Sequence, residues 1–246
     1  MADLDTRPGP REYLSSFRQH VRKPISNALE RVQRERREEV RERDAFEAFA
    51  DRVADLPTTS STSQSVFAVT ALPDRSTTDT EALRQAYRDT VMSVPHYETV
   101  YDESLTENVR AELGPEIAAL FTSTTGPSLL LEHQRAVLSA AEQARTDREE
   151  FQDTLDAESE SLRSLREDLT AVLDELDSTI VPAWYRQQFH DNLLAIIETR
   201  QSQLEERSIP QLDGHDLCES LYQDEPQTYP VLMAVARLHD CVTIRG

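Results

Sequence analysis

The chain has 246 residues, of which 26 are basic and 46 acidic, so its formal net charge is −20. Two cysteines are too few for a disulfide framework, and five glycines argue against collagen or a glycine-rich phosphate loop. The sequence has no apolar run near the ~18 residues that span a bilayer, and its N-terminus has no apolar signal core. We therefore expect a cytoplasmic protein with reduced thiols and no membrane partner.

The basic residues are almost all arginine. Lys23 is the only lysine, and the other 25 basic residues are arginines. Carboxylates keep their hydration in concentrated salt, whereas long lysine stems add apolar surface that salting-out would drive together. At 1 M salt the Debye length is ~3 Å, so a large net charge costs little stability. The composition favours a salt-adapted cytoplasm; the alternative is an acidic mesophilic protein with arginine-biased codons.

Prolines and glycines divide the chain into runs rich in good helix formers, which predicts an all-α fold. We expect residues 1–24 to be flexible or short helical and residues 25–246 to form a single helical domain. A helix over about 10–22 should break near Pro24, and a long helix should follow over about 25–56. The middle of the long helix mixes both charge signs, which is typical of a solvated, ion-paired face.

The polar residues 57–65 predict a mobile linker. Two Ser/Thr-x-x-Glu capping boxes then predict helices over about 78–93 and 104–113. Gly114 and Pro115 should end the second of these, and a further short helix should reach about Phe121.

The dominant element should be a helix over 128–178 that continues, after a short connection, into a helix over 182–207. Its apolar side chains recur in heptads, which is typical of a coiled-coil seam. The seam comprises Phe151, Leu155, Leu162, Leu165, Leu169, Val172 and Leu176, with Gln134, Arg148 and Glu158 as polar exceptions. The short connection predicts an antiparallel coiled-coil hairpin over 128–207, at the centre of an elongated helical bundle. Shorter helices are expected over 216–222 and 231–242.

The second helix of this hairpin is about half as long as the first, so part of the seam needs another partner. The helix over 25–56 could cover it, and so could an unknown protein or a second copy of the chain bound along Leu130–Leu176. The favoured function is therefore a non-enzymatic interaction or scaffold protein that acts through coiled-coil surfaces.

Three stretches are similar to an uncharacterised haloarchaeal family with a domain of unknown function. They are AYRDTVMSVPHY at 86–97, VPAW at 181–184 and DGHDLCESLYQDEPQTYPVL at 213–232. The resemblance extends over most of the chain beyond residue 20. It implies a halophilic archaeal origin, in agreement with the scarcity of lysine, and it carries over no catalytic or binding residue.

Two histidines and two cysteines could act as zinc ligands, namely His215, Cys218, His239 and Cys241. However, His239 and Cys241 are two residues apart on an expected helix, which separates them by ~200° around its axis. The favoured interpretation is that both cysteines pack as small apolar residues. We therefore expect no metal and no cofactor.

A second candidate is an enzymatic site near His215 and Asp216, in which the histidine would act as a general base oriented by a carboxylate. The competing interpretation is favoured: Asp213 precedes Gly214 in a turn, and Asp216 caps the next helix. His96, beside Tyr97 and near Tyr101, is likewise interpreted as a packing cluster with polar tips. No catalytic residue is predicted.

The arginine-rich segment 7–43 suggests an alternative function as a nucleic-acid-binding or transcription-associated regulator. Residues 1–43 carry 11 basic and 8 acidic side chains, whereas the rest of the chain is strongly acidic. Against this alternative, the interleaved glutamates almost cancel the arginines, and phosphate contacts weaken steeply as salt rises. Nucleic-acid binding is therefore the less favoured hypothesis.

Overall fold

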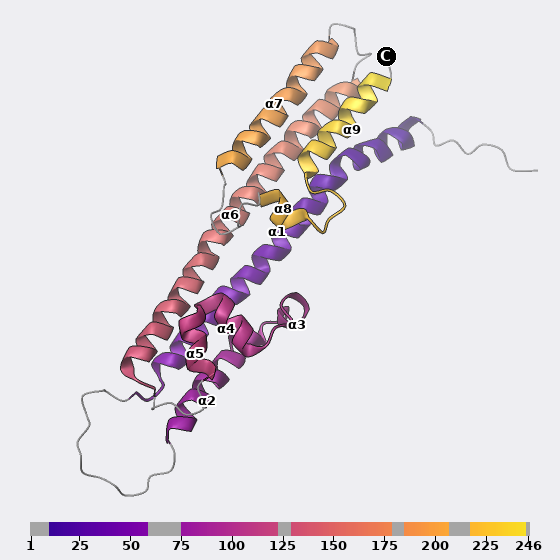
Figure 1. Ribbon diagram of the computed structural model, residues 1–246. Coiled ribbons are helices and arrows are strands. Elements are labelled where there is room, and N and C mark those ends of the chain that lie inside the picture. The colour runs from indigo at the N-terminus through magenta and orange to yellow at the C-terminus, as the bar shows by residue number, and fades with distance from the viewer. Residues whose placement is uncertain (1–9, 59–74, 123–128, 179–184, 207–216, 245–246) are drawn as a thin grey trace, which may run out of the picture. The chain divides into compact units, whose positions relative to one another are not determined.

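The computed structural model describes residues 10–58, 75–122, 129–178, 185–206 and 217–244 (Figure 1). Nearly all of these residues are helical and none lies in a β-strand, so the all-α prediction is confirmed. The described elements are α1 (Pro10–Ala54), α2 (Arg75–Arg88), the 3-10 helix η1 (Val91–Ser93), α3 (Tyr97–Val100), α4 (Leu105–Leu113), α5 (Pro115–Thr122), α6 (Leu131–Ser178), α7 (Tyr185–Glu206), α8 (Leu217–Tyr222) and α9 (Pro230–Ile244).

The chain forms two compact units. Unit 1 comprises residues 1–35 and 154–246, and unit 2 comprises residues 36–153. The long helices α1 and α6 each contribute to both units. The expectation that residues 25–246 form a single domain remains a prediction.

Helix α1 runs through Pro24, so the expected break near this residue is wrong. Proline has no N–H to donate to the carbonyl one turn earlier, here that of His20. A donor from another helix replaces it: Nη1 of Arg237, on α9, lies 2.8 Å from the carbonyl oxygen of His20. Because this carbonyl keeps a partner, the helix continues where the sequence alone predicts a stop.

Unit 1 is built around the C-terminal part of α6, against which α7 runs antiparallel, as expected (Figure 1). The seam leucines Leu155, Leu162, Leu165 and Leu169 are each at most 1% exposed. Apolar residues of α1, α7, α8 and α9 complete this core, including Ile25, Val32, Leu193, Leu221 and Leu238. Residues 59–65 of the expected linker lie outside the described residues. The side chain of the seam residue Leu176 is not described either.

Unit 2 has a separate core made by α1, α2, α4, α5 and α6. Four aromatic rings lie at its centre, and Tyr87 makes edge-to-face contacts with Phe46, Phe49 and Phe121. The small residues that continue the seam of α6, Val137, Ala141 and Ala144, belong to this core. This part of the seam is thus covered by the chain itself, including the part of α1 from Phe46 onwards.

One of the two predicted capping boxes is confirmed. Ser104 caps α4, its hydroxyl accepts from the Glu107 N–H, and the Glu107 carboxylate accepts from the Ser104 N–H in return. The other is wrong, because α2 begins at Arg75 and ends at Arg88 instead of spanning 78–93. Glu81, expected to close that box, instead pairs with Arg84 and Arg88 at 3.0 Å each.

No helix within the described ranges combines the length and the apolar character needed to cross a membrane.

The compensation at Pro24 gives a direct test. Arg237→Met should lower the free energy of unfolding by about 1 kcal/mol, because the His20 carbonyl loses its donor. In a Pro24→Ala background the alanine N–H takes over, so the same substitution should cost clearly less. A double-mutant cycle measured by chemical denaturation checks this coupling, with Arg34→Met elsewhere on α1 as the control. Equal costs in both backgrounds would contradict this role of Arg237.

Candidate functional site

Of the four residues considered for zinc, the structure describes the side chains of two, Cys218 and His239. His215 and Asp216 lie outside the described residues, as do Asp213 and the side chain of Cys241. Cys218 is buried, whereas His239 is exposed on α9. Within the described ranges, no three histidine, cysteine or acidic side chains are arranged to hold a metal ion.

Several arginines of the segment 7–43 are engaged within the protein. Arg18 pairs with Asp174 at 2.8 Å. Arg31 pairs with Glu35 at 3.0 Å and donates to the Leu221 carbonyl at 3.2 Å, so it joins α1 to α8. Arg18 and Arg31 of the arginine-rich segment therefore make contacts within unit 1.

The polar exceptions in the α6 seam each hold α6 to another element. Gln134 donates to the Val53 carbonyl at 2.7 Å and to the Leu56 carbonyl at 3.2 Å, which satisfies acceptors at the C-terminal end of α1. Arg148 and Glu158 are each the centre of a larger polar cluster, one in each unit. These two clusters are the most polar buried places among the described residues.

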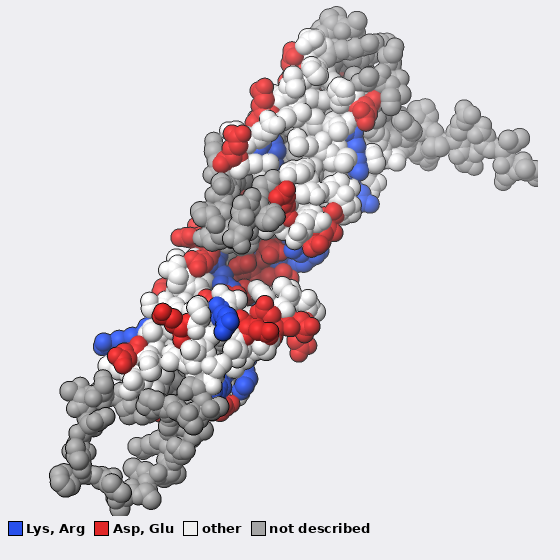
Figure 2. All heavy atoms as spheres, in the orientation of Figure 1, with Lys and Arg blue, Asp and Glu red and all other residues white. Residues whose placement is uncertain are grey.

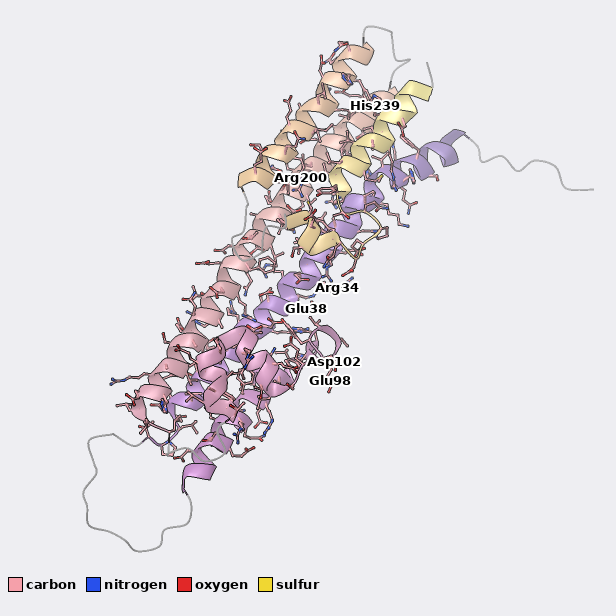
Figure 3. All side chains as sticks on the ribbon, viewed as in Figure 1. Arg34, Glu38, Glu98, Asp102, Arg200 and His239 are labelled. Atoms are coloured by element: carbon pink, nitrogen blue, oxygen red, sulfur yellow. The ribbon has the colours of Figure 1, made fainter. Side chains whose placement is uncertain are left out.

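In unit 1 the cluster is centred on a buried ion pair between Glu158 and Arg200. Nη1 and Nη2 of Arg200 each lie 2.8 Å from one oxygen of the Glu158 carboxylate, and the two side chains are 0% and 2% exposed. Tyr222 on α8 donates to the same carboxylate at 3.0 Å. Nη2 of Arg200 also lies 3.2 Å from Sγ of Cys218. The cluster therefore joins α6, α7 and α8 at one point, close to the Arg200 label in Figure 3.

Burial and mutual attraction set the ionisation of this cluster. Burial disfavours the charge on Arg200, but the Glu158 carboxylate outweighs it and holds the pKa of Arg200 above its usual value. Burial and the Glu158 charge raise the pKa of the Tyr222 phenol, so this phenol keeps its proton and donates. A charge pair with no exposure needs both partners, because either one alone would be left uncompensated.

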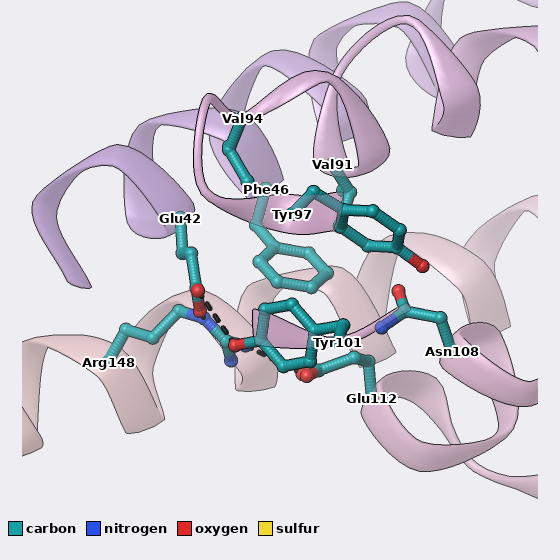
Figure 4. Close-up of a pocket in the computed structure, with 9 residues that line it drawn as sticks. All are labelled: Glu42, Phe46, Val91, Val94, Tyr97, Tyr101, Asn108, Glu112 and Arg148. Atoms are coloured by element: carbon teal, nitrogen blue, oxygen red, sulfur yellow. Dashed lines mark hydrogen bonds and ion pairs between the residues drawn. The ribbon is translucent and has the colours of Figure 1, made fainter. Parts of the chain in front are cut away.

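In unit 2 the cluster is centred on Glu42, which is 6% exposed in the middle of α1 (Figure 4). One carboxylate oxygen lies 2.8 Å from Nε2 of His96 and accepts from the Tyr101 hydroxyl at 2.7 Å. The other oxygen accepts from Nε of Arg148 at 2.9 Å, and Arg148 also pairs with Glu112 at 2.8 Å. Its guanidinium lies over the Phe46 ring, 4.6 Å from the centroid.

The charges in this second cluster are closely coupled. Burial disfavours the charge on Arg148, but Glu112 and Glu42 hold its pKa above the usual value. Burial raises the pKa of Glu112, and Arg148 opposes that rise. Burial, followed by the Glu42 charge, raises the pKa of Tyr101. The arrangement joins α1, α4, α6 and the two residues that flank α3 through charge-assisted hydrogen bonds.

A small hollow lies beside this cluster, lined by Phe46, Tyr97, Tyr101, Asn108 and Arg148 among others (Figure 4). It offers about 10 Å³ to the centre of a water molecule. That space suits about one water molecule. The contacts of the cluster hold helices together, and the hollow beside it has room for about one water molecule.

Sequence reasoning missed the central role of Glu42, because the stretch around it was interpreted as solvated. A signal was available: Glu42, Phe46, Phe49 and Val53 follow one another at helical spacings of four, three and four, which puts them on one face of α1. All four are buried. Arg200 carries the same signal, because Phe189, Leu193, Ile196 and Arg200 also follow one another at spacings of four, three and four, and all four are buried on one face of α7.

The most exposed apolar surface in unit 1 lies on α7 and α9, two helices that pack against each other in antiparallel directions (Figure 1). Figure 2 shows mainly uncharged side chains over these helices. We call this surface the α7–α9 face; it comprises Leu194, Ile197, Tyr229, Leu232, Met233 and Ala236. Leu194, Tyr229 and Met233 are 41%, 37% and 38% exposed. At one end of the face His190 and His239 are neighbours, with ring centroids 6.1 Å apart. Figure 3 labels His239.

The buried ion pair predicts a strongly non-additive mutational response. Arg200→Met alone and Glu158→Met alone should each lower the free energy of unfolding by about 3–5 kcal/mol, because each leaves a buried charge without its partner. The combined variant Glu158→Met, Arg200→Met, Tyr222→Phe should be more stable than either single variant. Equilibrium denaturation measures all three. Additive losses, or single losses below about 1 kcal/mol, would contradict the ion pair's coupling.

The buried phenols predict alkaline instability. Burial, followed by the Glu103 charge, raises the pKa of Tyr97 to about 12 from the ordinary 10. Burial also raises the pKa of Tyr87, Tyr101 and Tyr222. The folded state holds these protons more tightly, so the stability they contribute is complete below pH 10 and falls as pH rises above it. Tyrosinate absorbance and loss of helical circular dichroism should rise together above pH 10. Full tyrosine ionisation with the helices intact would contradict this.

The comparisons with known proteins place the chain in a family. No curated protein and no solved structure matches it. A family model matches residues 23–245, which is most of the chain and includes both polar clusters and the α7–α9 face. The chain therefore belongs to the family described as Domain of unknown function (DUF7260).

Proposed function

We propose that this protein is a non-enzymatic interaction protein that docks a partner protein on the α7–α9 face. One observation carries the proposal: among the described residues, four large apolar side chains are markedly exposed, and three of them, Leu194, Tyr229 and Met233, lie on this face. The fourth, Val100, lies in unit 2. Clustered exposed apolar side chains are typical of interaction surfaces, whereas scattered ones are ordinary.

The α7–α9 face is better suited to docking than the seam of α6. The seam leucines Leu155, Leu162 and Leu169 are buried within unit 1 by the chain's own helices. A partner bound to them would first have to displace these helices, at the cost of the buried area. Association along Leu130–Leu176, by a second copy or another protein, stays a prediction and is less favoured than docking on the exposed face.

The polar clusters support an interaction function more than catalysis. In both of them the charged side chains are occupied by one another: Glu158 by Arg200, and Glu42 by Arg148 and His96. The hollow beside Glu42 has space for about one water molecule. The Glu158–Arg200 and Glu42–Arg148 pairs are also almost fully buried.

We further propose a salt-loaded archaeal cytoplasm as the setting, supported by the net charge of −20 and the single lysine. Concentrated salt screens long-range charge interactions and strengthens apolar association. An apolar docking surface on a very acidic protein is therefore effective under these conditions.

A position-specific crosslinking experiment tests this function. A photo-crosslinking residue would replace Leu194 or Met233 in the full chain, and, as a control, Thr199, which is exposed about 140° around α7 from Leu194. In halophile extracts with molar KCl, positions 194 and 233 should crosslink to the same protein. Position 199 should not, and a Leu194→Asp variant should abolish the crosslink from position 233. Equal crosslinking at all three positions, or none at any, would contradict docking on this face.

A further inference from the structure

The charges around the α7–α9 face indicate the chemistry of its partner. Two arginines on α7 and α9 have described side chains, and both are engaged inside unit 1. Arg200 is buried against Glu158, and Arg237 donates to the His20 carbonyl. Apart from Arg237, which is half-buried and makes its contact with His20 at the surface, the exposed formal charges of these two helices are acidic in the described part: Asp191, Glu198, Glu205 and Asp240.

These carboxylates lie beside the apolar residues. On α7, Asp191 and Glu198 are three residues before and four residues after Leu194, which places them on the adjoining side of the same helix. On α9, Asp240 continues the row of Tyr229, Met233 and Ala236 at helical spacing. The surface thus combines an apolar centre with an acidic rim.

We infer that the α7–α9 face takes an amphipathic helix of another protein, with an apolar stripe flanked on both sides by basic residues. This inference rests on the proposed function and specifies its partner. Two packed antiparallel helices offer a groove into which a third helix can lay its apolar side chains. The row from Tyr229 to Asp240 rises about 16 Å along the axis, equivalent to about three turns of a bound helix.

High salt is compatible with this charge complementarity. At 1 M salt the Debye length is about 3 Å, so attraction at long range is lost. An arginine in hydrogen-bonding contact with a carboxylate still lies within that distance, and its fork geometry favours carboxylates. The apolar stripe supplies most of the affinity, and the rim contacts select the sign of the flanking charges.

The test uses two synthetic amphipathic peptides with the same leucine stripe, one flanked by arginines and the other by glutamates. Fluorescence anisotropy with the full chain, in molar KCl, should show the arginine peptide binding at least about tenfold more tightly. Leu194→Asp with Met233→Asp should weaken its binding about tenfold or more, although both changes add negative charge. Thr199→Asp, which adds the same type of charge elsewhere on α7, should leave binding unchanged. Circular dichroism verifies that each variant is folded.

The rim is tested separately with Asp191→Asn, Glu198→Gln and Asp240→Asn combined. This variant should bind the two peptides with nearly equal affinity. If the unchanged protein already binds both peptides equally, and both are lost in the Leu194 and Met233 variant, the inference about basic flanks is overturned while docking on the face stands. If the aspartate substitutions at 194 and 233 leave binding unchanged or strengthen it, binding is electrostatic, and both the inference and the docking face are contradicted.

Discussion

The structure depends on the burial of one face along each of two very long helices. Helices of 45 and 48 residues, such as α1 and α6, gain little from their own backbone and are stabilised by the side chains they bury. The chain supplies that cover itself, with α7, α8 and α9 in unit 1 and α2, α4 and α5 in unit 2. Short helices thus protect the apolar faces of the long ones.

Buried charges specify how these helices pair. A uniformly apolar seam permits a helix to shift along its neighbour by a turn, because leucine packs against leucine at many registers. Glu158 can meet Arg200, and Arg148 can meet Glu42, only at one register each. Desolvation makes such pairs a poor source of stability, and we interpret them as devices that fix alignment. The outer surface of α7 and α9 combines exposed apolar side chains with carboxylates beside them.

Local signals in the sequence predicted much of the fold. The helical class, the hairpin of α6 and α7 and the capped start of α4 follow from residue spacing and capping chemistry. Two errors occurred where a distant residue decides a local outcome: the continuity at Pro24 depends on Arg237, and Glu42 is buried with His96, Tyr101 and Arg148 as partners. None of these four partners can be identified from spacing along the chain. The α7–α9 face was also missed, since exposure depends on which helices pack together.

The central claim is that the chain buries the α6 seam itself and exposes the α7–α9 face. Hydroxyl-radical footprinting of the intact protein in molar KCl, read by mass spectrometry, measures the accessibility of both sets of side chains at once. The account predicts rapid modification of Leu194 and Met233 and strong protection of Leu155, Leu162 and Leu169. Seam leucines modified as fast as Leu194 would contradict it.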